Sequence, residues 1–291
     1  MPSGQTPLPA TIERAAHLIS GASALLVCAG AGMSADSGLP TFRNGGGLWT
    51  MTTKVGTRDV SFDEIAQPKW FHHRPEVAWG FYGWRAHQYA KAEPHVGYQI
   101  LRRWSLKMPQ RSFVYTSNVD GLFAKSGMGD QHIVECHGTI HLLQCRKQSC
   151  GSGLWPTADV AIVVNDELKV AEPPLPKCPR CGRVARPNIL MFDDVSFLKT
   201  RRRQQLQEFE RWLFGVETET LVILEIGAGT TVPTVRRTAE DVARRMRAPI
   251  IRINRDDHAP MLRDDRLSID MGAADALEAI DRVLDVQRLF D

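Results

Sequence analysis

An amide and a carboxylate stand two residues apart where a short apolar segment ends. Asn118 and Asp120 follow the segment from Ser112 to Thr116, in the sequence TSNVDGL. In an extended chain residues two apart point the same way, so both side chains are expected to reach into one space. The alternative is a turn at the end of the strand in which each side chain binds its own backbone.

A histidine in the sequence ECHGTI is the candidate for proton transfer. Imidazole is suited to moving protons near neutral pH. His137 follows a strand-like segment and precedes Gly138. His132 and His141 have no such setting, and we interpret them as structural residues.

Four of the six cysteines form two closely spaced pairs. Cys145 and Cys150 have four residues between them, and Cys178 and Cys181 form a C-x2-C pair. In a reducing compartment this spacing predicts a tetrahedral Zn site rather than disulfides, and four unrelated buried thiols are the alternative. The two remaining cysteines, Cys28 and Cys136, are interpreted as core thiols.

Glycines follow the first apolar segment, in the sequence CAGAGMSADSG. Gly30 and Gly32 would let backbone amides approach a pyrophosphate at the start of a helix. Ala35 stands where the third glycine of a dinucleotide fingerprint is usual, and no clear acidic residue follows about 20 positions later. A tight strand–helix turn is therefore an open alternative.

The sequence SGLPTFRNGGGLW, which comes next, suggests a lid. Three consecutive glycines, 45–47, would make this segment mobile. Arg43 could then meet a phosphate or a ribose, and Phe42 could shield a reacting centre from water.

Apolar segments that alternate with helical ones must position these residues. The pattern predicts an α/β fold with a Rossmann-like, doubly wound parallel sheet. Segments 49–92, rich in aromatic residues and helical in appearance, and 141–185, with the cysteine pairs, are expected to form a smaller inserted domain. The sheet domain is then expected over 10–48, 93–140 and 186–291. The strands are expected at 24–29, 113–115, 132–136, 220–226, 249–253 and 267–269, and the clearest helices at 11–20, 235–246 and 274–289.

The composition is that of an ordinary globular protein. Of the 291 residues, 43% are hydrophobic and 24% charged, and the net charge of +3 gives no electrostatic case for nucleic-acid binding. The basic run Arg201–Arg203 is interpreted as a solvated helix face. The first nine residues lack the pattern of a signal peptide and are expected to be frayed, and no apolar run approaches the ~18 residues that span a bilayer. We expect a cytoplasmic protein.

Taken together, these motifs resemble those of the sirtuins of bacterial type, the NAD-dependent protein deacylases. The resemblance extends from about Ala24 to Leu277. Its blocks are GAGMSADSGLPTFR, TSNVDGL, ECHGTI followed by the cysteines, RPNILMFDD, IGAGTTVP and the dipeptide Ile253–Asn254.

The resemblance implies an activity and its products. An acyl-lysine protein would react with NAD to give nicotinamide, O-acyl-ADP-ribose and free lysine. His137 would activate a ribose hydroxyl, Asn118 and Asp120 would hold the nicotinamide carboxamide, and the four cysteines would bind a structural Zn. The cofactor-binding residues implied are Ala29, Gly30, Ala31, Gly32, Met33, Asp36, Thr41, Phe42, Arg43, Ser117, Asn118, Val119, Asp120, Gly227, Ala228, Gly229, Asn254, Arg255, Gly272 and Ala273.

The chain departs from the family pattern at three places. Thr41 replaces Asp, Ser117 replaces Gln, and FDD at 192–194 replaces F-G-E. The first two substitutions touch the expected NAD pocket. The third touches the strand that would pair with the substrate peptide.

Tyr82 and Arg85, in WGFYGWRAH, resemble the pair that recognises acidic acyl groups in desuccinylases and demalonylases. Their spacing places them on one helix face, and Phe192 is a further candidate contact of the acyl group. The alternative is a solvated Arg85 beside a core tyrosine. Two other functions stay open: an NAD hydrolase or ADP-ribosyltransferase that uses the same pocket, and a non-catalytic nucleotide sensor.

Overall fold

The structure, a computed structural model, describes residues 10–41, 53–55, 58–158, 161–165, 170–255 and 265–287. The N-terminal segment that we expect to be frayed lies outside these ranges. None of the helices in the described ranges is long and apolar enough to cross a membrane.

Six parallel strands form the main sheet, in the order β13–β12–β11–β1–β4–β5. Every residue of the three central strands is buried, as expected for strands that are covered on both faces. The sheet consists of β1 (Ala24–Ala29), β4 (Ser112–Thr116), β5 (Ile133–Glu135), β11 (Leu221–Ile226), β12 (Ile250–Ile253) and β13 (Arg266–Ile269).

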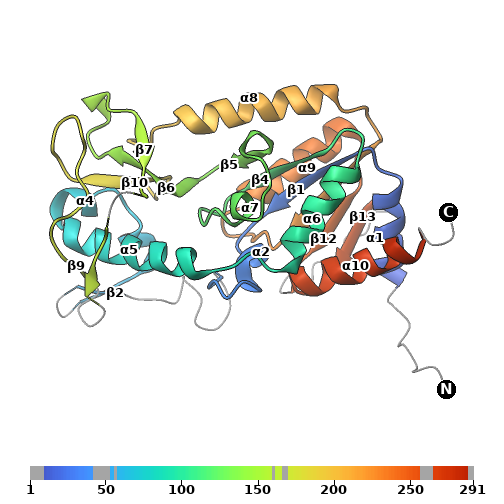
Figure 1. Cartoon of the computed structure of the whole chain (residues 1–291), viewed down its shortest axis with the longest axis horizontal. Coiled ribbons are helices and arrows are strands. Elements are labelled where there is room, and N and C mark those ends of the chain that lie inside the picture. Colours follow the sequence, from blue (N-terminus) through green and yellow to red (C-terminus); the bar gives the residue numbers. More distant parts are fainter. Residues whose placement is uncertain are drawn as a thin grey trace, which may run out of the picture.

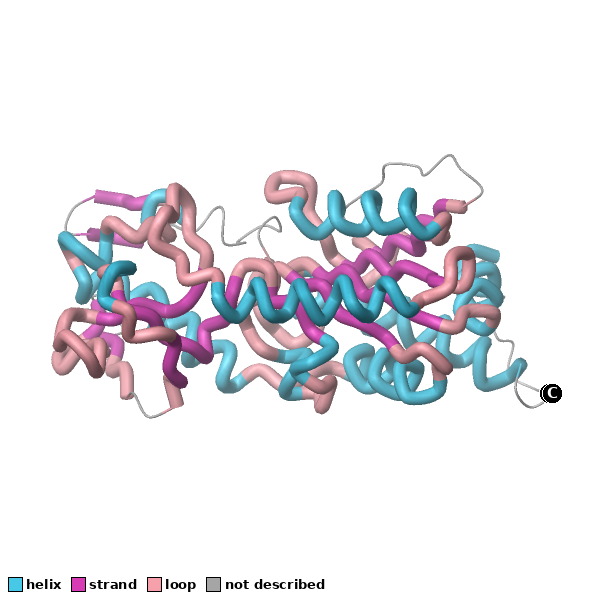
Figure 2. Tube along the Cα trace, turned by 90° about the horizontal axis from the view of Figure 1, so that it is seen from above, coloured by secondary structure: helices cyan, strands magenta, loops and turns pink. Residues whose placement is uncertain are grey.

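Helices cover both faces of this sheet (Figures 1 and 2), so the prediction of a doubly wound fold is confirmed. Alternate residues of β1 enter different cores: Leu25 and Val27 join one, and Leu26 joins the other. The first core is closed by α1 (Ala10–Ser20), α6 (Val96–Lys107) and α10 (Ala273–Gln287), and the second by α8 (Thr200–Gly215) and α9 (Thr234–Met246).

A second part lies at the end of the molecule opposite α1 (Figure 1). Its three-stranded sheet has the order β10–β6–β7, and a long helix, α5, packs beside it. The elements are α3 (Phe62–Ile65), α4 (Trp70–His73), α5 (Pro75–Lys91), β6 (Gly138–Cys145), β7 (Leu154–Pro156) and β10 (Ala185–Ile189), with the short pair β8 (Val164–Asn165) and β9 (Val170–Ala171). The boundaries between the two parts stay a prediction.

The expectation that 49–92 is helical is wrong in one place. β2 (Thr53–Val55) and β3 (Arg58–Val60) form an antiparallel pair there. Threonine and valine, which occur in these strands, are β-branched and favour strands.

The expectation of a solvated basic face on α8 is also wrong. α8 packs along β5, so two of the three arginines reach the end of that strand. Arg201 pairs with Glu135 at 2.9 Å, and Arg202 donates from NH1 to the carbonyl oxygen of Cys136 at 3.3 Å. Of the three arginines, only Arg203 is exposed.

Candidate active site

Two glycine loops meet at the carboxyl ends of β1 and β11. A Cβ atom on Gly30 would lie 2.6 Å from the carbonyl oxygen of Gly227, and one on Gly32 would lie 2.6 Å from the Cα of Gly227. The backbones approach so closely that only glycine fits. The chain connects β1 to β4 on one side and returns through β11 on the other, and ligands of open α/β sheets bind at such a reversal.

A cavity of about 420 Å³ opens at this point, lined by residues of both parts of the molecule. It brings together most of the predicted site: Gly30, Ala31, Gly32, Thr41, Tyr82, Arg85, Ser117, Asn118, Val119, Asp120, His137, Phe192, Gly227, Ala228, Gly229 and Asn254.

One serine links the predicted amide and carboxylate. Asn118 Nδ2 donates to Ser34 Oγ at 3.0 Å, and Ser34 Oγ donates to Asp120 Oδ2 at 2.7 Å. The hydroxyl of Tyr98 lies 3.0 Å from the same Oγ, whose only proton is directed to Asp120. Sequence reasoning missed Ser34, although it lies within the glycine motif.

Asp120 is both a turn residue and a cavity residue. Its Oδ1 accepts a bond from the backbone N–H of Leu122 at 2.9 Å, so the turn considered as an alternative is present. Burial raises the pKa of Asp120 above its ordinary value, although the bonds from Leu122 and Ser34 act in the opposite direction. The cavity therefore holds a carboxylate that ionises less readily than usual.

His137 lies in the turn between β5 and β6 and lines the same cavity. Its carbonyl oxygen accepts a bond from the N–H of Leu190 at 2.8 Å. Gly138 has a φ of 79°, and a Cβ there would lie 2.0 Å from the carbonyl oxygen of Asn188, so the glycine is required. Burial, and then the charge of Arg202, lowers the pKa of His137 to about 4. The imidazole is therefore uncharged at neutral pH and able to accept a proton.

The other two histidines of this region have structural contacts, as we interpreted them. His141 Nε2 lies 3.0 Å from the carbonyl oxygen of Asp120, and the ring of His132 packs at 5.9 Å against that of Phe113.

Arg85 is a buried cation in the cavity wall, only 7% exposed. Its Nε donates a hydrogen bond to the hydroxyl oxygen of Tyr89 at 2.9 Å, and its Nη2 donates to the same oxygen. Its guanidinium lies 5.4–5.9 Å from the ring centres of Phe62, Phe81, Tyr82 and Tyr89. Because Arg85 is buried, the alternative of a solvated Arg85 is wrong. Among the described residues no carboxylate lies within ion-pair distance of it.

Tyr89 was not found from the sequence. It lies four residues after Arg85, on the same face of α5, which is the only signal that points to it. Tyr82, the predicted partner, contacts Arg85 through its ring, and burial raises its pKa to about 12. Phe192 lines the cavity and packs edge-on to Phe62.

The remaining predicted residues lie apart from the cavity lining. Ala29 and Met33 are fully buried beneath it.

Asp36 Oδ2 accepts a bond from the N–H of Ala274 at 2.9 Å, and Asp36 Oδ1 lies 3.6 Å from Nη2 of Arg255. A Cβ on Gly272 would lie 2.3 Å from that Nη2, so Asp36, Arg255, Gly272 and Ala273 gather at the start of α10. Phe42 and Arg43 lie outside the described residues.

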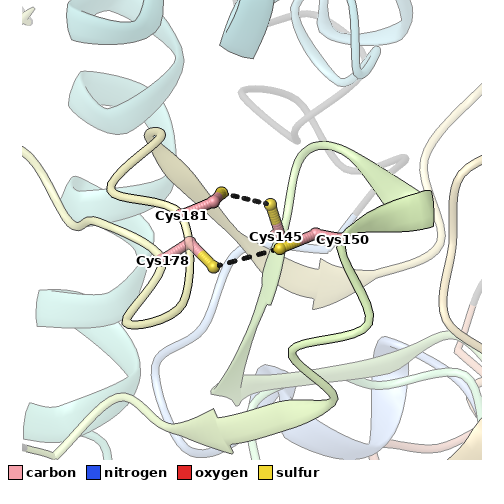
Figure 3. Close-up of side chains that lie close together, drawn as sticks. All are labelled: Cys145, Cys150, Cys178 and Cys181. Atoms are coloured by element: carbon pink, nitrogen blue, oxygen red, sulfur yellow. Dashed lines mark hydrogen bonds between the residues drawn. The ribbon is translucent and has the colours of Figure 1, made fainter.

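The four paired cysteines converge (Figure 3). Their sulfur atoms all lie within 4.8 Å of one another, and Cys145–Cys181 and Cys150–Cys178 are 3.7 and 3.8 Å apart. Tetrahedral Zn–S bonds of about 2.3 Å place sulfurs about 3.8 Å apart. The cluster therefore fits one Zn ion with four protein ligands. Cys28 and Cys136 lie outside it and are buried, as expected of core thiols.

The sequence profile of the Sir2 family matches residues 30–213, a segment that contains His137 and all four of these cysteines. The chain belongs to the Sir2 family, the sirtuins. This sirtuin is 32% identical over 221 residues to the NAD-dependent protein deacylase of Thermococcus kodakarensis, with 76% of each chain aligned. It is 34% identical over 183 residues to that of Thermococcus sibiricus, which aligns over 65% of its own length, just under two thirds.

Solved structures give the same result. An ADP-ribose complex of a Sir2 homologue matches with a TM-score of 0.69 and 25% identity, covering 95% of this sirtuin and 98% of that chain. A Sir2 homologue in complex with NAD matches with a TM-score of 0.68 and 25% identity, covering 94% of both chains. The likeness in structure therefore extends well beyond residue 213, where the segment matched by the family profile ends.

Proposed function

We propose that this sirtuin is an NAD-dependent protein lysine deacylase that releases nicotinamide, O-acyl-ADP-ribose and free lysine. The observation that supports this most directly is one cavity that combines Asn118, Asp120 and an uncharged His137 with the two glycine loops. Relatives named NAD-dependent protein deacylase agree with it. The substrates are then proteins that carry acylated lysines.

The residues present fit NAD. The amides of the two glycine loops can meet its phosphates, and Asn254, whose Nδ2 donates to the carbonyl oxygen of Ala228 at 3.1 Å, lies where it can hold the adenosine ribose. Asp36, Arg255, Gly272 and Ala273 surround the adenine end in this proposal. When bound, NAD supplies the ribose carbon that takes up the acyl group as nicotinamide leaves.

In this proposal two side chains bind the carboxamide of NAD and a third accepts the proton. Asn118 and Asp120 offer acceptor oxygens to the NH2 group of the carboxamide, because the two hydrogens on Asn118 Nδ2 are directed to Gly30 and Ser34. Ser34 fixes both side chains in orientation. The ring of His137 takes a proton from a ribose hydroxyl, which its uncharged state allows at neutral pH.

The Zn has a structural role in this proposal. Four thiolates leave no open position at the ion for water or substrate. The site joins the loop after β6 to the loop before β10 (Figure 3). Four cysteines that gather as a metal site rather than as disulfides are typical of a reducing compartment, which supports the cytoplasmic location that we also propose.

Mass spectrometry of the products formed from NAD and a panel of acyl-lysine peptides tests the function. O-acyl-ADP-ribose together with free lysine supports deacylation. ADP-ribose alone would make this sirtuin an NAD hydrolase, and an ADP-ribosylated peptide would make it a transferase. Binding of NAD without any product would indicate a sensor.

We further propose a preference for acidic acyl groups such as succinyl or malonyl, with Phe192 and Tyr82 in the wall of the acyl site. The support is Arg85, a buried guanidinium in the cavity wall that has aromatic neighbours and, among the described residues, no carboxylate partner. A cation in such a site is poorly compensated, and a carboxylate on the substrate would compensate it.

A further inference from the structure

Arg202 of α8 lies against the turn that carries His137. Its NH1 donates to the carbonyl oxygen of Cys136, the residue before the histidine, at 3.3 Å. Its guanidinium lies 5.5 Å from the ring centre of Phe197, and its Nε is buried without a hydrogen-bond partner. None of the carboxylates in the described ranges forms an ion pair with it. Arg202 is thus an uncompensated positive charge beside the candidate base.

The other charged groups around this turn are engaged elsewhere. The thiol of Cys136 and the phenol of Tyr82 are neutral, because burial raises the pKa of each to about 12. Two of the ionisable side chains on the neighbouring elements are in ion pairs, Glu135 with Arg201 and Asp194 with Arg186. Asp120 and Arg85 have hydrogen bonds to the neutral hydroxyls of Ser34 and Tyr89. After burial, the charge of Arg202 is the cause that lowers the pKa of His137.

We propose that Arg202 is a positioning residue of the active site: its hydrogen bond to the carbonyl oxygen of Cys136 orients the turn that carries His137, and its guanidinium disfavours a second positive charge on the imidazole. The charge acts because a protonated imidazole beside a fixed guanidinium is disfavoured by like-charge repulsion. Burial disfavours the same protonated form, so the two effects add. Removing the guanidinium should leave only the effect of burial.

The consequence for catalysis rests on the proposed function. A base must be unprotonated when the hydroxyl proton is transferred. The fraction of enzyme with an unprotonated base therefore decreases as the pH drops below the pKa of that base. Arg202 therefore extends activity to a lower pH than burial alone would allow.

Three substitutions separate the charge from the hydrogen bond. Arg202→Met removes both, Arg202→Gln retains a donor without the charge, and Arg202→Lys retains the charge. Arg203→Met, at the exposed neighbouring position on α8, is the matched control. Circular dichroism establishes that each variant is folded.

The direct readout is NMR titration with carbon-13-labelled histidine, in which the spectrum of His137→Gln identifies the signal among the nine histidines. The pKa of His137 should rise in Arg202→Met and Arg202→Gln and stay at the wild-type value in Arg202→Lys and Arg203→Met. An unchanged pKa in Arg202→Met overturns the proposal. A wild-type value in Arg202→Gln overturns the role of the charge.

Activity supplies a second readout. The acid limb of kcat/KM for deacylation should move to higher pH in Arg202→Met, while the loss at neutral pH stays smaller than the loss at acidic pH. A uniform loss at every pH would overturn the proposal. The titration requires no turnover, so it tests Arg202 even if the products show that the proposed function is wrong.

Discussion

Ser34 fixes the two side chains that we expect to hold the carboxamide. Its hydroxyl accepts a bond from Asn118 and donates one to Asp120, so neither side chain needs to search for its orientation when a ligand arrives. Its role could not be predicted from the sequence, because Asn118 and Asp120 lie more than eighty positions away. At the residue scale the proposed chemistry depends on single side chains with shifted pKa values, Asp120 and His137.

His137→Ala tests the proposed base. We expect the fold and NAD binding to remain and deacylation to fall ~10²–10⁴-fold, the usual contribution of a general base. Nicotinamide exchange should survive, since release of nicotinamide does not require the base. Steady-state deacylation and isotope exchange measure the two steps. His87→Ala, at an exposed position on α5, is the control, and full activity in the His137 variant would refute the assignment.

Asp120→Asn separates stability from function. Because the folded-state pKa of Asp120 is raised above its ordinary value, the folded chain prefers the protonated form. Its contribution to stability is fully present below pH 3.8 and is lost as the pH rises through the folded pKa. The neutral amide keeps an acceptor for Leu122 and avoids this loss.

We therefore expect Asp120→Asn to be more stable than the wild type at neutral pH, with a difference that disappears in acid. Thermal unfolding at a series of pH values measures it. The affinity for NAD should fall about ten- to hundredfold, the value of a charged hydrogen bond of ~1.5–3 kcal/mol. A variant that is less stable than the wild type at neutral pH would contradict the predicted increase in stability.

Two elements shape the acyl side of the cavity. α5 presents Tyr82, Arg85 and Tyr89 on one face, because residues three and four apart on a helix are neighbours. The loop after β10 presents Phe192, and the buried ion pair Arg186–Asp194 ties that loop to its own strand. Asp193 in this loop is exposed and has a φ of 55°, so it keeps the left-handed backbone for which the family uses glycine.

Arg85→Met tests the acyl preference at this scale. Methionine keeps the apolar stem among the aromatic rings and removes the charge. Desuccinylation should fall about ten- to hundredfold relative to deacetylation, since charged hydrogen bonds contribute ~1.5–3 kcal/mol. Competition between succinyl- and acetyl-lysine peptides measures the ratio, with Lys91→Met on the same helix as the control. Equal loss of both activities, or a wild type inactive on succinyl peptides, would leave plain deacetylation.

Over the whole molecule, features that depend on local sequence were predictable and features that depend on distant contacts were not. The glycine loop, the cysteine pairs and the strands of the main sheet follow from residue type and spacing. The order of the strands, the β2–β3 pair and the inward turn of Arg201 and Arg202 do not. The two arginines sit in a run that is typical of a solvated face, and only the packing of α8 on β5 brings them to the end of that strand.

Cys178→Ala tests the structural role that we propose for the Zn site in the smaller part of the molecule. We expect loss of the metal and of most soluble protein, because three remaining ligands cannot fasten loops that have little core of their own. Metal analysis of the purified protein should give one Zn per chain. Cys28→Ala, outside the cluster, should retain the metal, and active protein without Zn would end this interpretation.

β6 connects two places that share no chemistry. Its first residue, Gly138, follows His137, its last, Cys145, belongs to the thiolate cluster, and β10 pairs with it at both ends. A strand of this length measures about 23 Å at about 3.3 Å per residue. A tilt of about 3° at the sulfur end moves the other end by about 1 Å, a misplacement that can slow a reaction about 10²-fold. Displacement of the cysteine cluster at one end of β6 would therefore be transmitted to His137 at the other end, although the cluster itself never meets the substrate.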